Sequence, residues 1–120
     1  MSPRIVPMIH VPDVNATMDW YSSIGFTIVR WNEQDGHTDW ALVTLGDSEL
    51  MFSEGGKPSD AWRREMDLYT HIENVDVLFL RLKDKVEVVE EPHDTFYGMR
   101  EFIIRDCNRF WLSFGQPITP

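Results

Sequence analysis

Apolar and polar residues alternate in short runs along this chain, and the pattern occurs twice. Residues 10–14 and residues 71–75 each end an alternating run, and each is followed by apolar residues at helical spacing. The first helix is predicted over residues 13–24, with Asp13 as its N-cap. The second is predicted over residues 74–84, with Asn74 as its N-cap.

Strands are predicted around these helices, and each half of the chain has the order β-α-β-β-β. After the opening strand of each half, the alternating segments are residues 26–31, 40–45, 50–53, 86–89, 100–105 and 110–113. The sequence therefore predicts a single α+β domain of two βαβββ modules. Module one spans about residues 4–54, a polar linker follows at about 55–65, and module two spans about 66–116. One helix covers only one face of each sheet, so the other face is expected to curve around a cavity.

Alternation also divides the strand residues between the two faces. Pairing Ile104 with Trp111 and Phe102 with Ser113 would place these four side chains on the concave face. A face that mixes aromatic and isolated polar groups is typical of a small-molecule site. The candidate ligand-binding residues are Trp40, Met51, Tyr69, His71, Phe102, Trp111, Ser113, His10 and Asp67.

Composition narrows the choice of partner. The chain has 120 residues, 42% of them hydrophobic, and a formal net charge of −9. Such an acidic surface repels nucleic acid and anionic lipid, so neither is expected as a partner. One cysteine, a polar start and the lack of an apolar run long enough for a membrane span favour a cytoplasmic protein.

Several segments resemble one known superfamily over nearly the whole chain. They are the Val11-Pro12-Asp13 turn, the helix that carries Trp20-Tyr21 and ends at Gly25, and above all Tyr97-Gly98-Met99-Arg100-Glu101-Phe102. The sequence resembles the glyoxalase, bleomycin-resistance and extradiol-dioxygenase (vicinal oxygen chelate) superfamily, and its bleomycin-resistance branch most. The resemblance implies an open U-shaped mixed sheet, a homodimer and ligand sites in the concavity.

The same resemblance implies where a metal would bind. The enzymes of this superfamily hold a divalent ion on the first and last strands of their modules, and the matching positions here are Val6, Ser53, Asp67 and Ser113. Only Asp67 is a metal ligand by type, so no metal and no other cofactor is expected. His10 and His71 end the two first strands and are expected to make structural hydrogen bonds. His71 and Asp67 would lie about 13 Å apart along an extended strand, too far to share an ion.

These observations favour a metal-free binding protein that sequesters a flat, cationic small molecule, such as a bleomycin-type antibiotic, at a dimer cavity. No catalytic residue is assigned. The alternative is a glyoxalase- or dioxygenase-like enzyme (lyase, isomerase or oxygenase) with a non-standard or metal-independent site. A role unrelated to antibiotics is the third possibility. Arg100 is expected either to pair with Asp67 or Glu101 or to contact the ligand.

Overall fold

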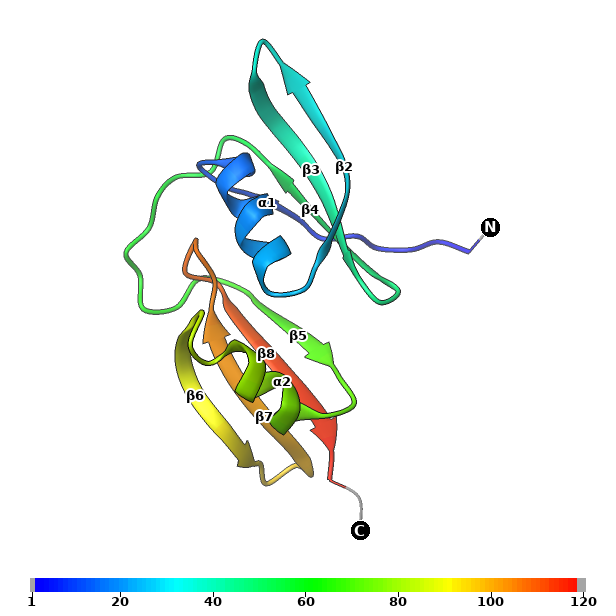
Figure 1. Ribbon diagram of the computed structural model, residues 1–120, viewed down its shortest axis with the longest axis vertical. Coiled ribbons are helices and arrows are strands. Elements are labelled where there is room, and N and C mark those ends of the chain that lie inside the picture. Colours follow the sequence, from blue (N-terminus) through cyan, green and yellow to red (C-terminus); the bar gives the residue numbers. More distant parts are fainter. Residues whose placement is uncertain (1, 119–120) are drawn as a thin grey trace. The chain divides into compact units, whose positions relative to one another are not determined.

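The computed structural model describes residues 2–118 and divides the chain into two compact units (Figure 1). Unit one is Met1–Ser59 and unit two is Asp60–Pro120. Each described unit contains one helix and a four-stranded mixed sheet, as the repeated β-α-β-β-β pattern predicted. The two modules of the predicted α+β fold are confirmed.

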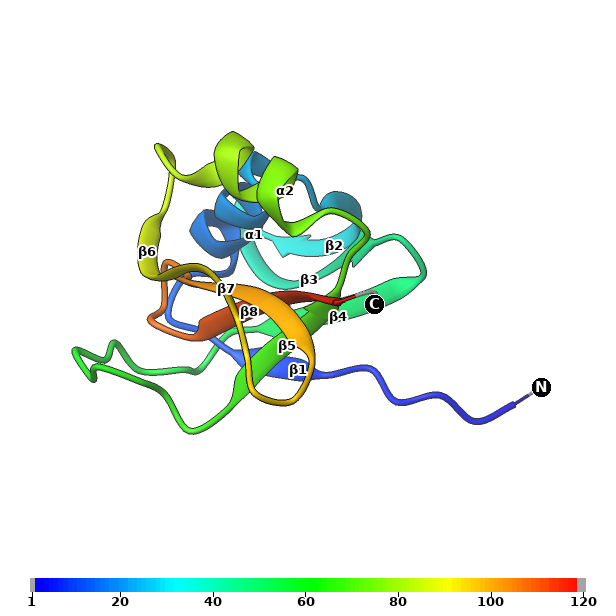
Figure 2. The same cartoon turned by 90° about the horizontal axis from the view of Figure 1, so that it is seen from below.

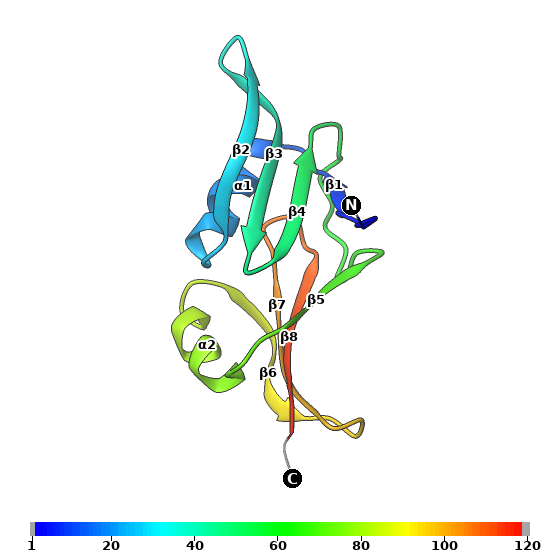
Figure 3. The ribbon, with the colours of Figure 1, turned by 90° about the vertical axis from the view of Figure 1, so that its right-hand side faces the viewer.

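The first unit has the strand order β1-β4-β3-β2, which can be followed in Figure 3. Strands β1 and β4 are parallel, and the other neighbours are antiparallel. Its elements are β1 (Met8–His10), α1 (Val14–Ser23), β2 (Thr27–Gln34), β3 (His37–Leu45) and β4 (Ser48–Ser53). The second unit repeats this arrangement in the order β5-β8-β7-β6. Its elements are β5 (Asp67–His71), α2 (Val75–Leu82), β6 (Glu87–Asp94), β7 (Met99–Arg105) and β8 (Trp111–Pro117).

Both helices begin at the predicted caps. The Asp13 carboxylate accepts a hydrogen bond from the amide of Ala16, and the Asn74 side chain accepts one from Val77. In α1 the buried residues are Val14, Thr17, Met18 and Tyr21, which form one stripe at helical spacing. In α2 the ends of the stripe, Val75 and Leu82, are buried. Figure 2 shows α2 lying over one side of the sheet formed by β5–β8.

The sheet cores lie on the faces that the helices cover. Ala41 and Val43 of β3 and Phe52 of β4 are buried, and the Tyr21 ring of α1 lies 4.8 Å from the Phe52 ring. In the second unit the Phe102 ring stacks on Phe114 at 5.1 Å and meets Phe79 of α2 edge-on at 5.4 Å. These contacts fix which side chains of each sheet face away from the helix.

The opening strand is shorter than alternation indicates. Only Met8–His10 forms β1, and Ile5, which alternation along residues 5–9 would place on the helix side with Ile9, is 93% exposed. Before Met8 the Pro7 carbonyl accepts a hydrogen bond from the Met51 amide at 2.9 Å, but no strand is formed there.

The register of the last hairpin differs from the prediction and changes one site assignment. Arg105 pairs with Trp111, and Phe102 pairs with Phe114 rather than with Ser113. Because side chains alternate, this shift of one residue moves Phe102 to the helix-covered face, where it is fully buried. The expected place of Phe102 on the ligand face is therefore wrong.

Candidate functional site

The second sheet has a face that α2 does not cover, which we call the open face. Its side chains alternate with the core residues Phe102, Leu112 and Phe114. The open face carries Asp67, Tyr69 and His71 of β5, Trp111, Ser113 and Gly115 of β8, and Glu101, Ile103 and Arg105 of β7. Five of the predicted ligand-binding residues lie here: Asp67, Tyr69, His71, Trp111 and Ser113.

Trp111 is the large aromatic side chain of β8 on this face, and a planar cation of the chain itself covers it. The Arg63 guanidinium carbon lies 4.3 Å from the centre of the Trp111 ring. The same guanidinium donates two hydrogen bonds to the Asp67 carboxylate. The side-chain hydrogen bond to Asp67 raises the pKa of Arg63, so this group stays charged. A flat cation thus stacks on an indole beside a carboxylate.

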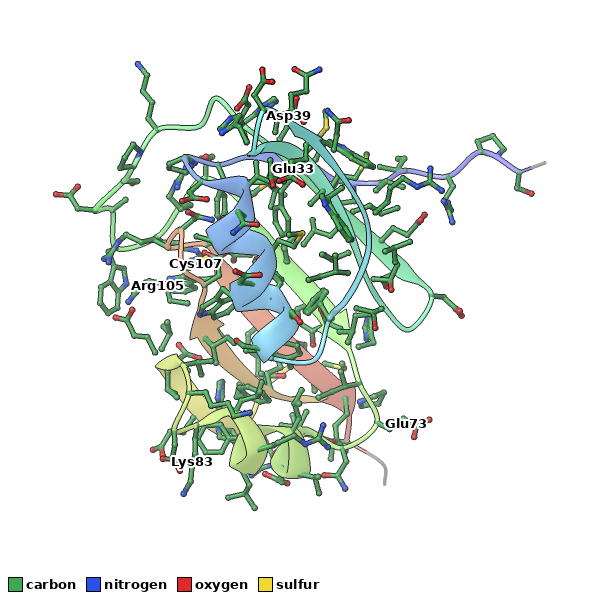
Figure 4. All side chains as sticks on the ribbon, turned by 45° about the horizontal axis from the view of Figure 1, so that its top comes forward. Glu33, Asp39, Glu73, Lys83, Arg105 and Cys107 are labelled. Atoms are coloured by element: carbon green, nitrogen blue, oxygen red, sulfur yellow. The ribbon has the colours of Figure 1, made fainter. Side chains whose placement is uncertain are left out.

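The segment that carries Arg63 is tied down by arginines of β7 and of the following turn. Buried Arg105, labelled in Figure 4, donates to the Trp62 carbonyl at 2.9 Å and stacks under the Trp62 ring. The second terminal nitrogen of Arg105, Nη1, donates to Glu87 at 2.5 Å. The Trp111 indole N–H donates to the Trp62 carbonyl at 3.1 Å, and Arg109 donates to the Ala61 carbonyl at 2.6 Å. Arg63 is therefore placed on Trp111 by its neighbours as well as by its own contacts.

Glu101 forms a second feature of the open face, together with two tyrosines. The Tyr69 and Tyr97 hydroxyls each donate to a different oxygen of the Glu101 carboxylate, both at 2.6 Å. Burial and its hydrogen bond to Glu101 raise the pKa of Tyr69, and the separate hydrogen bond from Tyr97 to Glu101 is the main cause that raises the pKa of Tyr97. Both phenols therefore keep their protons at neutral pH.

Gly115 makes this arrangement possible. It pairs with Glu101, and the Tyr69 ring passes over it to reach the carboxylate. A Cβ at this position would overlap the phenol oxygen and lie 2.7 Å from Cζ of Tyr69. Any larger residue at 115 must displace Tyr69.

The variant Gly115→Ala is therefore expected to break the Tyr69–Glu101 hydrogen bond while leaving the sheet intact. Without that bond, the pKa of the Tyr69 phenol should fall toward its ordinary value of about 10. Spectrophotometric titration of the tyrosines measures this change. Tyr69→Phe, which removes the phenol whose titration is followed, is the control and identifies the Tyr69 signal by its loss. An unchanged titration in Gly115→Ala would contradict the arrangement.

The remaining predicted residues lie in the first unit, where they share a sheet face. Trp40 pairs with Ser53, Met51 pairs with Leu42, and all four side chains are half-buried. This is the face predicted for them. The His10 ring hydrogen-bonds the Glu54 carbonyl at 3.1 Å, as expected for a structural histidine.

Arg100 does not make its predicted carboxylate contacts. It pairs with Asp76 of α2 and with Asp94 of β6, because it alternates with Glu101 and so faces the opposite side of the sheet. Glu101, Tyr97 and Arg63 also belong to this site and were not predicted from the sequence. Glu101 could have been noticed from its place in the motif directly before Phe102. The predicted pairing of Phe102 with Ser113, however, placed Glu101 on the face that the helix covers.

Enzymes of the superfamily that this sequence resembles bind a metal ion at four positions. The matching residues here do not provide a set of metal ligands. Asp67 is occupied by Arg63, and the other positions are Val6, Ser53 and Ser113. Within residues 2–118, no three His, Cys, Asp or Glu side chains are grouped so as to hold an ion. These residues do not fit a divalent metal.

A polar cavity of about 370 Å³ lies elsewhere, in the first unit. The His37 ring in its wall pairs with Glu54, and this hydrogen bond raises the pKa of His37. None of the predicted ligand-binding residues lines it. The lining residues are Pro12, Asp13, Val14, Asn15, Glu33, Gly36, His37, Thr38 and Glu54.

Comparison with known families agrees with the two-module architecture. The model of the Glyoxalase/Bleomycin resistance protein/Dioxygenase superfamily matches residues 5–114. The chain belongs to this superfamily. No curated protein matches the sequence. No helix of the described residues is long and apolar enough to span a membrane.

Several solved structures align with almost the entire chain. TioX from Micromonospora sp. ML1 is 19% identical, with a TM-score of 0.79 and coverage of 97% of this chain and 99% of that one. A bleomycin resistance determinant encoded on the transposon Tn5 is 17% identical, with a TM-score of 0.76 and coverage of 98% and 100%. A glyoxalase-related enzyme from Clostridium phytofermentans is 18% identical, with a TM-score of 0.76 and coverage of 98% and 97%. At these identities the likeness shows the fold alone.

Proposed function

We propose that this superfamily member is a metal-free binding protein that sequesters a flat, cationic small molecule on the open face of its second module. The observation that supports this most is the stack of Arg63 on Trp111 beside Asp67. Arg63 is itself a flat cation, so the contact it makes is the contact that such a ligand would make. A cation over an indole contributes about 0.5–2 kcal/mol, depending on how far it is removed from water.

The charge of the chain supports the same ligand class. A net charge of −9 attracts cations over long range, and at an ionic strength of about 0.1 M that attraction is largely screened beyond about 10 Å. Association with a cationic ligand is therefore expected to slow as salt is added. Among the similar structures, the Tn5 protein is named as a bleomycin resistance determinant, which is consistent with bleomycin-type antibiotics as one ligand class.

The proposal includes a cytoplasmic homodimer whose subunits enclose the ligand. Its support is that a single helix covers only one face of the four-stranded sheet in each module. Light scattering at micromolar concentration tests this, and a monomer would contradict it. The alternative function, a glyoxalase- or dioxygenase-like enzyme, would be favoured if each chain bound one metal ion.

Titration calorimetry with benzamidine, a flat aromatic amidinium, tests the binding function. Bleomycin serves as a larger cationic probe, and each titration is run with and without added Zn²⁺ or Ni²⁺. We expect binding that is independent of these ions and no stoichiometric metal in elemental analysis of the purified protein. A failure of both probes to bind, or binding that requires the metal, would overturn the proposal.

The variant Arg63→Ala is expected to bind benzamidine three- to tenfold more tightly than the unmodified protein. Arg63 competes for the Trp111 ring and for Asp67, so its removal frees both contacts. Calorimetry measures the difference. Lys83→Ala, which removes an exposed cation after α2, is the matched control for the change in net charge, and Lys83 is labelled in Figure 4. Weaker binding in Arg63→Ala would show that Arg63 does not compete with the ligand.

A further inference from the structure

Glu101 is a buried carboxylate whose charge has no cationic partner among the described residues. It is 4% exposed, and none of the ion pairs of residues 2–118 includes it. The preceding residue, Arg100, pairs with Asp76 and Asp94 instead. The other buried charge of β7, Arg105, is paired with Glu87. Charged groups are rarely buried without a partner of opposite sign. Arg105 has such a partner in Glu87, and Glu101 has no counterpart to it among the described residues.

The hydrogen bonds around Glu101 determine which ligand groups it accepts. Both phenol hydrogens, those of Tyr69 and Tyr97, are donated to the carboxylate. Each phenol oxygen therefore offers only lone pairs to a ligand. The raised pKa of Tyr69 and of Tyr97 means that neither loses its proton near neutral pH. The cluster of Tyr69, Tyr97 and Glu101, which we call the acceptor cluster, can accept hydrogen bonds but has no hydrogen left to donate.

A ligand can reach the acceptor cluster from solvent. Tyr69 is 43% exposed and Tyr97 is 56% exposed, while the carboxylate behind them is shielded from water. A shielded negative charge acts on a nearby cation more strongly than an exposed one does.

The acceptor cluster is separate from the Trp111 stack but lies on the same face. Glu101 pairs with Gly115, which is four residues after Trp111 on β8. At about 3.3 Å per residue, the two places lie about 13 Å apart along the strand. One extended molecule can contact both.

We propose that the acceptor cluster binds a primary ammonium or amidinium group, held by the Tyr69 and Tyr97 oxygens with Glu101 as its counter-charge. This rests on the proposed function, since the same ligand places its flat cationic ring on Trp111. The ligand class is thereby narrowed to a molecule with two N–H-bearing cationic groups about 13 Å apart.

Two probes that differ only at one end test this second group. Both are benzamidines with a six-carbon chain at the para position, one ending in a primary amine and the other in a methyl group. We expect the unmodified protein to bind the amine probe at least tenfold more tightly. In Glu101→Gln, which keeps the shape and removes the charge, that advantage should disappear. Trp111→Phe, which keeps an aromatic ring in β8, should retain it.

Controls separate this inference from the proposed function. Glu73→Gln makes the same charge change at an exposed side chain, labelled in Figure 4, and should keep the amine advantage. Tyr97→Phe should reduce the advantage at least threefold, and it decides the matter if circular dichroism shows that Glu101→Gln is unfolded. If both probes bind equally, or if the advantage survives in Glu101→Gln and Tyr97→Phe, the inference is wrong and the proposed function stands. If neither probe binds the unmodified protein, both are wrong.

Discussion

Replacement of Trp111 with alanine is expected to weaken benzamidine binding at least tenfold, about 1.4 kcal/mol. The substitution removes the ring on which the planar cation would stack. It also removes a side chain that is 9% exposed and donates a hydrogen bond to the Trp62 carbonyl. We therefore expect a loss of about 3–5 kcal/mol in the free energy of unfolding. Calorimetry measures the first effect and urea unfolding the second.

Because the alanine variant is expected to be less stable, Trp111→Phe provides a milder test of the stack. Phenylalanine keeps an aromatic face but lacks the indole N–H, so binding should weaken by less than threefold. Trp40→Ala removes the predicted aromatic residue of the first sheet and tests whether that face contributes. A folded Trp111→Ala protein that binds benzamidine as the unmodified protein does would remove Trp111 from the site.

Replacement of Phe102 with alanine is expected to lower the free energy of unfolding by about 3–5 kcal/mol. The ring is fully buried between Phe114 and Phe79 of α2, and its loss leaves a cavity in the core of the second unit. Urea unfolding followed by circular dichroism measures the effect. We expect Phe102→Ala to lower stability because it disrupts the core. We do not expect it to remove a contact with the ligand.

The milder variant Phe102→Leu separates these two roles. Leucine refills much of the space, so the protein should remain folded and bind benzamidine within twofold of the unmodified protein. A tenfold loss of affinity in folded Phe102→Leu would place Phe102 at the ligand face after all. That result would contradict the observed pairing of Phe102 with Phe114.

The hairpin turns explain why the two halves of a repeated sequence could not be treated alike. In the first unit Leu45 pairs with Ser48 across a two-residue turn, whereas in the second Arg105 pairs with Trp111 across a five-residue turn. The Asp106 carboxylate holds this longer turn by accepting from the amides of Asn108 and Phe110, both at 2.8 Å. Equal spacing in the sequence therefore gives different registers.

The backbone of that turn takes a conformation usual for glycine at Arg109, where φ is 72°. A residue with a Cβ is strained there, and the Arg109 side chain is held by the Ala61 carbonyl. The same arginine thus anchors the segment that carries Arg63. The longer turn and the Arg63 stack are connected through this residue.

Features that depend on near neighbours can be derived from the amino-acid sequence alone. The caps at Asp13 and Asn74, the buried stripe of α1 and the repeated β-α-β-β-β order all follow from spacings within one element or from comparison of the two halves. The sequence also placed Trp111, Tyr69 and Asp67 on one face, because alternation along β5 and β8 is local.

The contacts between elements, in contrast, depend on how the strands and loops pack in three dimensions. The sides of β7 on which Phe102 and Glu101 lie depend on the strand register, and a shift of one residue exchanges the two faces of a strand. The stack of Arg63 on Trp111 joins residues 48 positions apart, and the bond from Tyr69 to Glu101 joins residues 32 apart. Such contacts form only when folding brings distant segments together and buries their charged groups. The spacing of residues along the chain does not predict them.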